Sequence, residues 1–273
     1  MRARIPGVRY AVIGGSGTYS MNFPDDLKRE DIDLIEEEVV FETPYGESPP
    51  FKFFRFGEKT VATVRMHGWR AGVPRGVASQ QIFWVFREAG VERIIAEGGV
   101  GSVNHLLKPR DLLICSDYID LSMRKDVGLG GPYLLVMRQP VCPEITRRLI
   151  DSSEKLYPGR VFDRGIYAVT DGRHFESRAE VVMLGRVGAD VVGQSMCPEV
   201  YLAREIGACY GRLDIVVNYA EGVIRDWDHA ELKDIFYGLS AQVAEIILDA
   251  LGKLAGPDNG CGCRELRKDT LLK

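Results

Sequence analysis

Short apolar runs that alternate with helical patterns constrain the fold of this chain more than any other feature of its sequence. The strand-like runs, bounded by Gly, Asn or Asp, lie at residues 8–13, 60–64, 91–96, 111–115, 165–170, 190–192 and 213–217. Helical patterns lie between many of them, most clearly at residues 76–89, 143–156, 178–186 and 199–206. Such alternation is typical of crossover connections around a parallel or mixed sheet with helices on both faces. We therefore predict an α/β fold.

The last helical pattern is the best defined of all. Asp228 can cap its N-terminus, and Glu231 follows at the spacing of a capping box. A single apolar stripe then runs along the helix and consists of Leu232, Ile235, Leu239, Val243, Ile246 and Ala250. This stripe predicts a helix that packs on the sheet.

Length and composition fit one domain. The chain has 273 residues, of which 45% are hydrophobic and 27% charged, so that one large core can form. Its sequence contains no internal repeat and no linker long enough to separate two domains. We predict a single-domain layered fold over residues 1–255, with a central mixed β-sheet flanked by helices. A polar, mobile tail that contains Cys-Gly-Cys is expected over residues 256–273.

Charge and hydropathy argue against several classes of partner. The net charge is −4, with basic and acidic residues interspersed, so the sequence has no electrostatic footprint for nucleic acid or an anionic membrane. No stretch approaches the roughly 20 apolar residues that a membrane span needs. The first residues lead straight into a strand pattern and not into a signal peptide. We expect a cytoplasmic protein that binds small molecules, with no nucleic-acid or membrane partner.

The six cysteines fall into two groups. Four of them lie singly in apolar surroundings and suit buried thiols in a reducing compartment: Cys115, Cys142, Cys197 and Cys209. Cys261 and Cys263 lie in the polar tail, where two neighbouring ligands are too few for a tetrahedral metal site. We expect exposed thiols there, with a disulfide between the two as the alternative, and no metal site.

The first two of four loops that leave predicted strands carry residues suited to an anion. Ligands gather at the C-terminal ends of strands in open α/β sheets. Residues 14–18 read Gly-Gly-Ser-Gly-Thr, and their backbone N–H groups and the Ser16 hydroxyl can hold an anion, although a turn without a ligand is the alternative. The second loop places Arg65 two residues before His67, and an Arg fork suits phosphate oxygens. Each of these two residues alone would also fit a structural role.

The other two loops suit close approach to a ligand and contact with a flat base. Residues 97–104 place three glycines in five positions directly after an apolar strand, which lets backbone amides approach a ligand. Residues 170–177 bring Phe175 and Glu176 to a strand-to-helix junction. A base can stack on Phe175 while Glu176 accepts hydrogen bonds from its N–H groups.

These loops together resemble the trimeric purine nucleoside phosphorylase and methylthioadenosine phosphorylase family. The resemblance runs from residue 8 to residue 217 and is strongest in the segment HFESRAEVVMLGRVGADVVGQSMCPEVYLAREIG. Supporting matches are Thr43-Pro44-Tyr45-Gly46, Gly99-Val100-Gly101-Ser102 and Tyr118-Ile119-Asp120. It implies the layered α/β fold of the nucleoside phosphorylases, inorganic phosphate as co-substrate, no cofactor, and a homotrimer or a dimer of trimers.

The resemblance also implies a role for each matching residue. The expected phosphate ligands are Ser16, Arg65, His67, Ser195 and the backbone at Gly99. The purine would be met by Phe175, Glu176 and Asn218, and the catalytic residues would be Asn218, His67 and Glu176. The ribose side would be formed by Gln194 through its backbone, by His229 at the 5′-hydroxyl, and by Tyr133 from a neighbouring subunit.

The expected base pocket favours a 6-oxopurine. Glu176 can accept from N1–H, and the amide of Asn218 can donate to O6 or N7. The methylthioadenosine branch of the family has an Asp-x-Asp pattern where this chain reads Asn218-Tyr219-Ala220. The segment Arg65-Met66-His67 likewise resembles the Arg-x-His pattern of the 6-oxopurine branch. We predict phosphorolysis of inosine and guanosine to the free base and ribose 1-phosphate.

Three alternatives stay open. Residues 43–102 look closer to the methylthioadenosine branch, so 5′-methylthioadenosine or 5′-methylthioinosine is an alternative substrate, decided by the surroundings of C5′. The second alternative is a purine nucleosidase that uses water, motivated by Gly98 and by Gln194, where the family commonly has Met. The third is a non-catalytic nucleoside-binding protein, against which the retained Arg65 and His67 argue.

Overall fold

The computed structural model describes residues 4–255 and 260–271. Its helices are α1 (Arg75–Ala89), α2 (Pro143–Leu156), α3 (Arg178–Arg186), α4 (Met196–Ile206) and α5 (His229–Lys253), with short 3-10 turns η1 (Asp25–Leu27), η2 (Met66–Gly68) and η3 (Cys263–Leu266). Its strands are β1 (Tyr10–Ile13), β2 (Ile32–Val39), β3 (Glu42–Thr43), β4 (Gly46–Glu47), β5 (Phe51–Phe56), β6 (Lys59–Val64), β7 (Arg93–Ser102), β8 (Leu112–Leu113), β9 (Asp117–Asp120), β10 (Tyr133–Leu135), β11 (Val161–Phe162), β12 (Ile166–Val169), β13 (Val191–Gly193), β14 (Cys209–Tyr219) and β15 (Arg267–Asp269).

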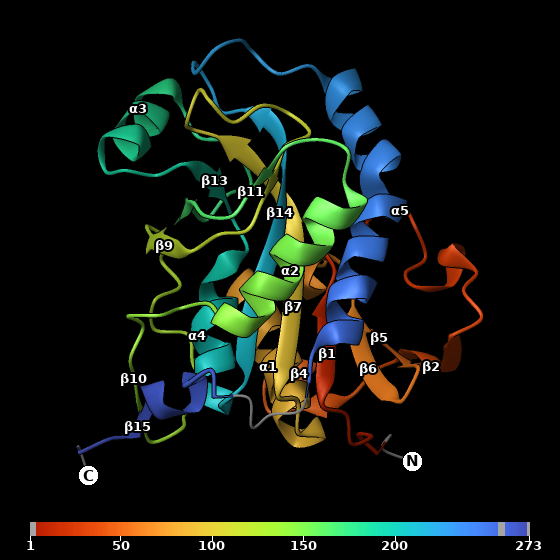
Figure 1. Cartoon of the computed structure of the whole chain (residues 1–273). Coiled ribbons are helices and arrows are strands. Elements are labelled where there is room, and N and C mark those ends of the chain that lie inside the picture. The colour runs from red at the N-terminus through yellow and green to blue at the C-terminus, as the bar shows by residue number, and fades with distance from the viewer. Residues whose placement is uncertain (1–3, 256–259, 272–273) are drawn as a thin grey trace.

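The strands build a central mixed sheet with helices on both faces, as the sequence predicts (Figure 1). The main path of the sheet runs β11-β8-β14-β7-β1-β6-β5-β2, and β13, β12 and β9 continue it from β7. α2 and α5 lie in front of the sheet in this view, and α1 and α4 lie behind it. Four consecutive strands of the sheet run parallel to one another, namely β6, β1, β7 and β14. Their C-terminal ends therefore lie at one edge of the sheet.

Two strands extend beyond their expected limits. The third predicted loop, residues 97–104, is mostly strand, because β7 continues through Ser102 and pairs with β14 as far as Tyr219. The glycines of this segment therefore lie in the sheet itself, and the side chains of Arg212 and Ser16 occupy the space that a Cβ at Gly98 or Gly99 would need. A register shift between Val216 and Asn218 interrupts the pairing near its end, and such bulges re-aim side chains next to functional sites.

α5 is a core helix, although it is long and apolar enough to cross a membrane by length and composition alone. That finding differs from our expectation that no segment of the chain meets those limits. Most of the predicted apolar stripe is buried in the core, namely Ile235, Leu239, Val243, Ile246 and Ala250. The N-terminal cap is present as predicted, since the carboxylate of Asp228 accepts from the Glu231 amide at 2.9 Å.

Residues 260–271 fold back onto the domain and do not form the mobile extension that we expected. β15 pairs antiparallel with β10, and the guanidinium of Arg267 lies 4.4 Å from the ring centroid of Tyr133. Cys263 is 3% exposed and Cys261 is half-buried, so the expectation of exposed tail thiols is wrong. The remainder of the predicted tail, residues 256–259 and 272–273, lies outside the described residues.

Candidate active site

A pocket at the C-terminal ends of β1, β7 and β14 collects side chains from all four predicted loops. The expected site residues that line it are Ser16, His67, Gly99, Phe175, Glu176, Gln194, Ser195 and Asn218. These residues are far apart in the sequence. Ser16, His67 and Asn218 meet because they follow or end parallel neighbouring strands, and the residues after β12 and β13 join them because β13 pairs antiparallel with the end of β7. The pocket therefore joins a set of anion-binding groups to a set of groups suited to a flat, polar base.

The buried carboxylate of Glu97 fills the glycine loop that follows β1. It accepts from the Gly17 amide at 2.8 Å, from the Thr18 amide at 3.0 Å and from the Thr18 hydroxyl at 2.8 Å, and the Gly15 amide also donates to it. These amides therefore hold a protein carboxylate, which corrects our expectation that they hold a bound anion. Within this loop, Ser16 lines the pocket, and its hydroxyl is the group that can contact a ligand.

Ser16 is fixed against the end of β7. Its Oγ accepts a hydrogen bond from the Gly99 amide at 2.8 Å, so the hydroxyl hydrogen is left to donate to a ligand. Glycine is required at position 99, because a Cβ there would lie 2.8 Å from Ser16 Oγ and 2.9 Å from a methyl group of Val217. The same hydrogen bond occupies the Gly99 amide that we expected to meet phosphate.

His67 is oriented by a second buried carboxylate. Its Nδ1 lies 2.7 Å from an oxygen of Glu199, whose other oxygen accepts from the Tyr210 hydroxyl at 3.0 Å. Burial raises the pKa of Tyr210, so this hydroxyl keeps its proton and donates. With Nδ1 donating to Glu199, Nε2 of the neutral ring is an acceptor. Nε2 faces the glycine loop, since a Cβ at Gly15 would lie 2.6 Å from it.

Arg65 points away from the pocket in this structure, and its role as a phosphate ligand stays a prediction. Its Nη2 donates to the carbonyl oxygen of Tyr19 at 2.8 Å, and its guanidinium lies 5.7 Å from the centroid of the Tyr19 ring. The cause is local backbone geometry, because Met66 and His67 both have positive φ angles, of 47° and 54°. This sharp turn brings Met66 to the pocket wall in place of Arg65.

Phe175 and Glu176 approach the pocket at the junction before α3. Phe175 is 48% exposed and packs edge-on against Trp227, with ring centroids 5.2 Å apart. Glu176 is 8% exposed, and one of its carboxylate oxygens accepts from the Thr170 hydroxyl at 2.5 Å. The second oxygen remains as an acceptor toward the pocket that Glu176 lines.

Asn218 lies next to the bulge near the end of β14 and is 7% exposed. Its Nδ2 donates to the carbonyl oxygen of Tyr219 at 2.7 Å. An amide nitrogen carries two hydrogens, so one N–H group of Asn218 is used internally and the other can donate to a ligand. The side chain is thereby held in one orientation at the pocket wall.

Of the three residues predicted on the ribose side, Gln194 lines the pocket, whereas His229 and Tyr133 do not. The side-chain oxygen of Gln194 accepts from Arg75 at 2.6 Å, and its backbone carbonyl accepts from Arg124 at 3.0 Å. The expected contact of its backbone with a sugar hydroxyl stays a prediction. His229 is the first residue of α5, is exposed and does not line the pocket, so its expected contact with the 5′-hydroxyl is not formed here. Tyr133 lies on β10 under Arg267, and its role in a neighbouring subunit's pocket stays a prediction.

Several pocket residues were not predicted from the sequence: Met66, Trp69, Glu221, Leu232 and Phe236. Glu221 directly follows the Asn-Tyr-Ala segment in which we found no carboxylate, and it accepts from the indole N–H of Trp227 at 2.9 Å. Leu232 was assigned to the stripe that faces the sheet. The i, i+4 spacing of Leu232 and Phe236 was the available signal that the start of α5 faces a shared apolar surface.

Comparisons with known proteins agree with this geometry. Residues 9–252 match the model of the phosphorylase superfamily. The chain is 34% identical to the 6-oxopurine nucleoside phosphorylase of Pyrococcus furiosus and 31% identical to the S-methyl-5′-thioadenosine phosphorylase of the same organism, in each case over 95% of this chain and 98% of the relative. A methylthioadenosine phosphorylase from an Antarctic soil metagenomic library has a similar structure, with a TM-score of 0.78 and 25% identity over 90% of this chain and 86% of that one. The chain belongs to the phosphorylase superfamily.

Proposed function

We propose that this enzyme is a purine nucleoside phosphorylase that acts on inosine and guanosine. The observation that carries the proposal is a single pocket in which Glu176 and Asn218 offer an acceptor and a donor beside Ser16, His67 and Ser195. A 6-oxopurine presents a donor at N1 and an acceptor at O6, which these two side chains complement. The relative from Pyrococcus furiosus named a 6-oxopurine nucleoside phosphorylase supports this choice.

Phosphate is held on one side of the pocket in this proposal. The Ser16 hydroxyl donates to a phosphate oxygen, because its own oxygen is engaged by the Gly99 amide. His67 Nε2 accepts from the OH group of hydrogen phosphate, with Glu199 holding the ring. Ser195 lies directly before α4 and lines the pocket, where its hydroxyl can donate to a phosphate oxygen.

The reaction transfers the ribosyl group from nitrogen to oxygen. A phosphate oxygen forms a bond to C1′ while the bond from C1′ to N9 breaks, and the electron pair of that bond remains on the purine. The sugar acquires oxocarbenium character, which the negative charge of the phosphate stabilises, so no protein nucleophile is needed. Asn218 donates to N7 or O6 as charge develops on the base. Glu176 accepts from N1–H and from the amino group of guanine.

A 5′-methylthio nucleoside with the same base is the second candidate substrate. His229, the expected partner of a 5′-hydroxyl, lies outside the pocket, whereas Leu232 and Phe236 line it with apolar surface. An apolar wall suits a methylthio group, which gains free energy on burial. The relative named an S-methyl-5′-thioadenosine phosphorylase supports this candidate as well.

Initial rates of base release, measured at saturating phosphate, separate these substrates. The panel consists of inosine, guanosine, adenosine, 5′-methylthioinosine and 5′-methylthioadenosine. We expect kcat/KM for inosine and guanosine to exceed that for adenosine by at least about tenfold, the equivalent of one hydrogen bond lost in the pocket. A higher value for 5′-methylthioinosine than for inosine would establish the second candidate. A preference for the adenine nucleosides would contradict the proposed base specificity.

The wider setting of the enzyme is also proposed from the family resemblance. We infer a cytoplasmic homotrimer or dimer of trimers that takes a nucleoside and inorganic phosphate, with no cofactor and no nucleic-acid or membrane partner. In such an assembly Tyr133 is the residue that closes the sugar pocket of a neighbouring subunit. The four free cysteine thiols that lie buried or half-buried together at the far end of the sheet fit a reducing compartment.

A further inference from the structure

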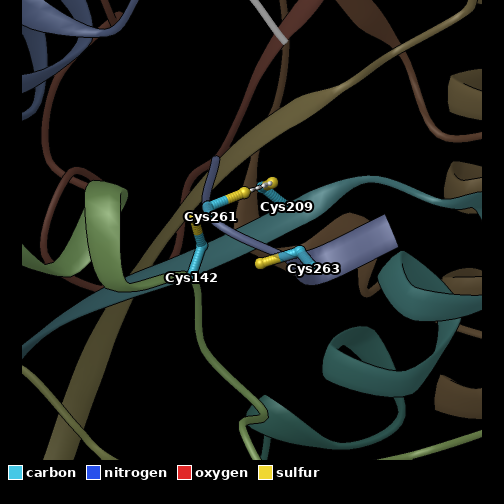
Figure 2. Close-up of side chains that lie close together, drawn as sticks. All are labelled: Cys142, Cys209, Cys261 and Cys263. Atoms are coloured by element: carbon cyan, nitrogen blue, oxygen red, sulfur yellow. Dashed lines mark hydrogen bonds between the residues drawn. The ribbon is translucent and has the colours of Figure 1, made fainter. Parts of the chain in front are cut away.

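Four cysteines from three distant segments converge at the N-terminal end of β14 (Figure 2). Cys142 is the N-cap residue of α2, Cys209 is the first residue of β14, and the other two, Cys261 and Cys263, lie on the C-terminal segment that folds back onto the domain. All four Sγ atoms lie within 4.8 Å of one another, and none of the four is in a disulfide. We call this set the cysteine cluster.

The spacing of the sulfur atoms suits a metal ion. A tetrahedral zinc site with Zn–S bonds of about 2.3 Å places its sulfurs about 3.8 Å apart. In the cluster, the Sγ atoms of Cys209 and Cys261 are 3.5 Å apart, well beyond the disulfide bond length of about 2.05 Å. We propose that the cysteine cluster is a structural site that binds one zinc ion through four thiolates.

The surroundings of the cluster stabilise negative charge. Four thiolates around a divalent ion leave a net charge of −2 on the site, which needs compensation in a buried location. Arg93 is 2% exposed, and its Nη1 lies 2.7 Å from the sulfur of Cys209 and 3.8 Å from that of Cys261. Cys142 lies at the N-terminus of α2, where the helix dipole favours an anion. Glu144 in turn forms an ion pair with Arg93 and fixes its position.

The position of the cluster assigns it a structural role. Cys209 begins β14, whereas Asn218 lies near the other end of the same strand, about 30 Å away at roughly 3.3 Å per residue. Four protein ligands leave no open position for a substrate, as in other structural zinc sites. The ion would tie residues 260–271 to the start of β14 and to the start of α2. The sequence predicted no metal site, because only Cys261 and Cys263 are neighbours in the chain and the fold alone brings Cys142 and Cys209 to them.

Metal analysis of the unaltered protein tests this inference directly. The protein is purified under reducing conditions with zinc present, excess metal is removed, and zinc and protein are quantified together. We expect one zinc per chain, and we expect cobalt substitution to give the visible absorption of a tetrahedral tetrathiolate site. Zinc below about 0.1 per chain in fully reduced protein would overturn the inference. Disulfides within the cluster of the freshly isolated protein, seen as a mass lower by two protons per bond, would also overturn it.

A matched pair of variants locates the ion. Cys263→Ser removes one cluster ligand, and we expect zinc affinity to fall at least tenfold. Cys115→Ser is the control, because Cys115 is also buried but lies outside the cluster, beside Asp214. It should retain one zinc per chain, and equal zinc loss in both variants would overturn the assignment. Zinc removal by a chelator should lower the melting temperature, and neither this readout nor the zinc content depends on the proposed activity.

Discussion

Asn218→Ala lowers kcat on inosine by roughly two to three orders of magnitude, the loss seen when an oxyanion-hole donor is removed. The variant lacks the N–H group that can stabilise charge on the departing purine. Asn218 is nearly buried at the pocket wall, and its contact with the Tyr219 carbonyl holds the side chain in place. Because the donor acts on charge that develops during bond breaking, the loss should lie mainly in kcat and less in the KM for inosine.

Steady-state kinetics with inosine at saturating phosphate measure this effect. Asn22→Ala is a suitable control, because Asn22 lies outside this pocket and its side chain bonds to Lys52 and not to a pocket residue. Its kcat should stay within about twofold of the unaltered enzyme. Asn218→Asp adds a second readout, since a carboxylate accepts from an exocyclic amine and cannot donate to O6. The ratio of inosine to adenosine turnover should fall in that variant. Near-normal turnover of Asn218→Ala would exclude Asn218 from the mechanism.

His67→Ala raises the KM for phosphate by about two orders of magnitude, because a charge-assisted hydrogen bond in a desolvated site is lost. The KM for inosine should change little, since the base and the sugar meet other residues. Arg65→Ala, measured in the same way, tests the other predicted phosphate ligand, because Arg65 donates to Tyr19 outside the pocket in this structure. A phosphate KM that changes by less than about threefold would exclude Arg65 from the phosphate site. Saturation curves in phosphate at fixed inosine measure both variants, and an unchanged phosphate KM in His67→Ala would contradict the proposed phosphate site.

Local sequence signals predicted the helices well. α2 and α3 have the expected bounds, and α5 begins behind the Asp228 cap that the sequence indicated. Each of these features depends on residues within a few positions of one another. β5, which reads FKFFRF and is mostly buried, was not predicted. Neither was β2, which reads IDLIEEEV and is mostly exposed, so that no apolar run marks it. It is a strand because it pairs with β5 at the edge of the sheet.

Most of the predicted site residues line the pocket, since loops that leave neighbouring strands converge whatever their exact conformation. The features of the site that the sequence did not predict have non-local or conformational causes. The glycine loop after β1 is filled by Glu97, which belongs to β7 and reaches it only because the two strands are neighbours. Arg65 is turned outward by the left-handed backbone of Met66 and His67, and nothing in the residue types requires that conformation. The cysteine cluster likewise depends on where the C-terminal segment folds back.

Product analysis of one reaction tests the central claim most directly, namely that phosphate and not water cleaves the nucleoside. The enzyme is incubated with inosine at increasing phosphate concentration, and hypoxanthine, ribose 1-phosphate and ribose are quantified. We predict hypoxanthine and ribose 1-phosphate in equal amounts, with a rate that saturates in phosphate and approaches zero without it. Hypoxanthine release that is independent of phosphate and accompanied by free ribose would contradict the account.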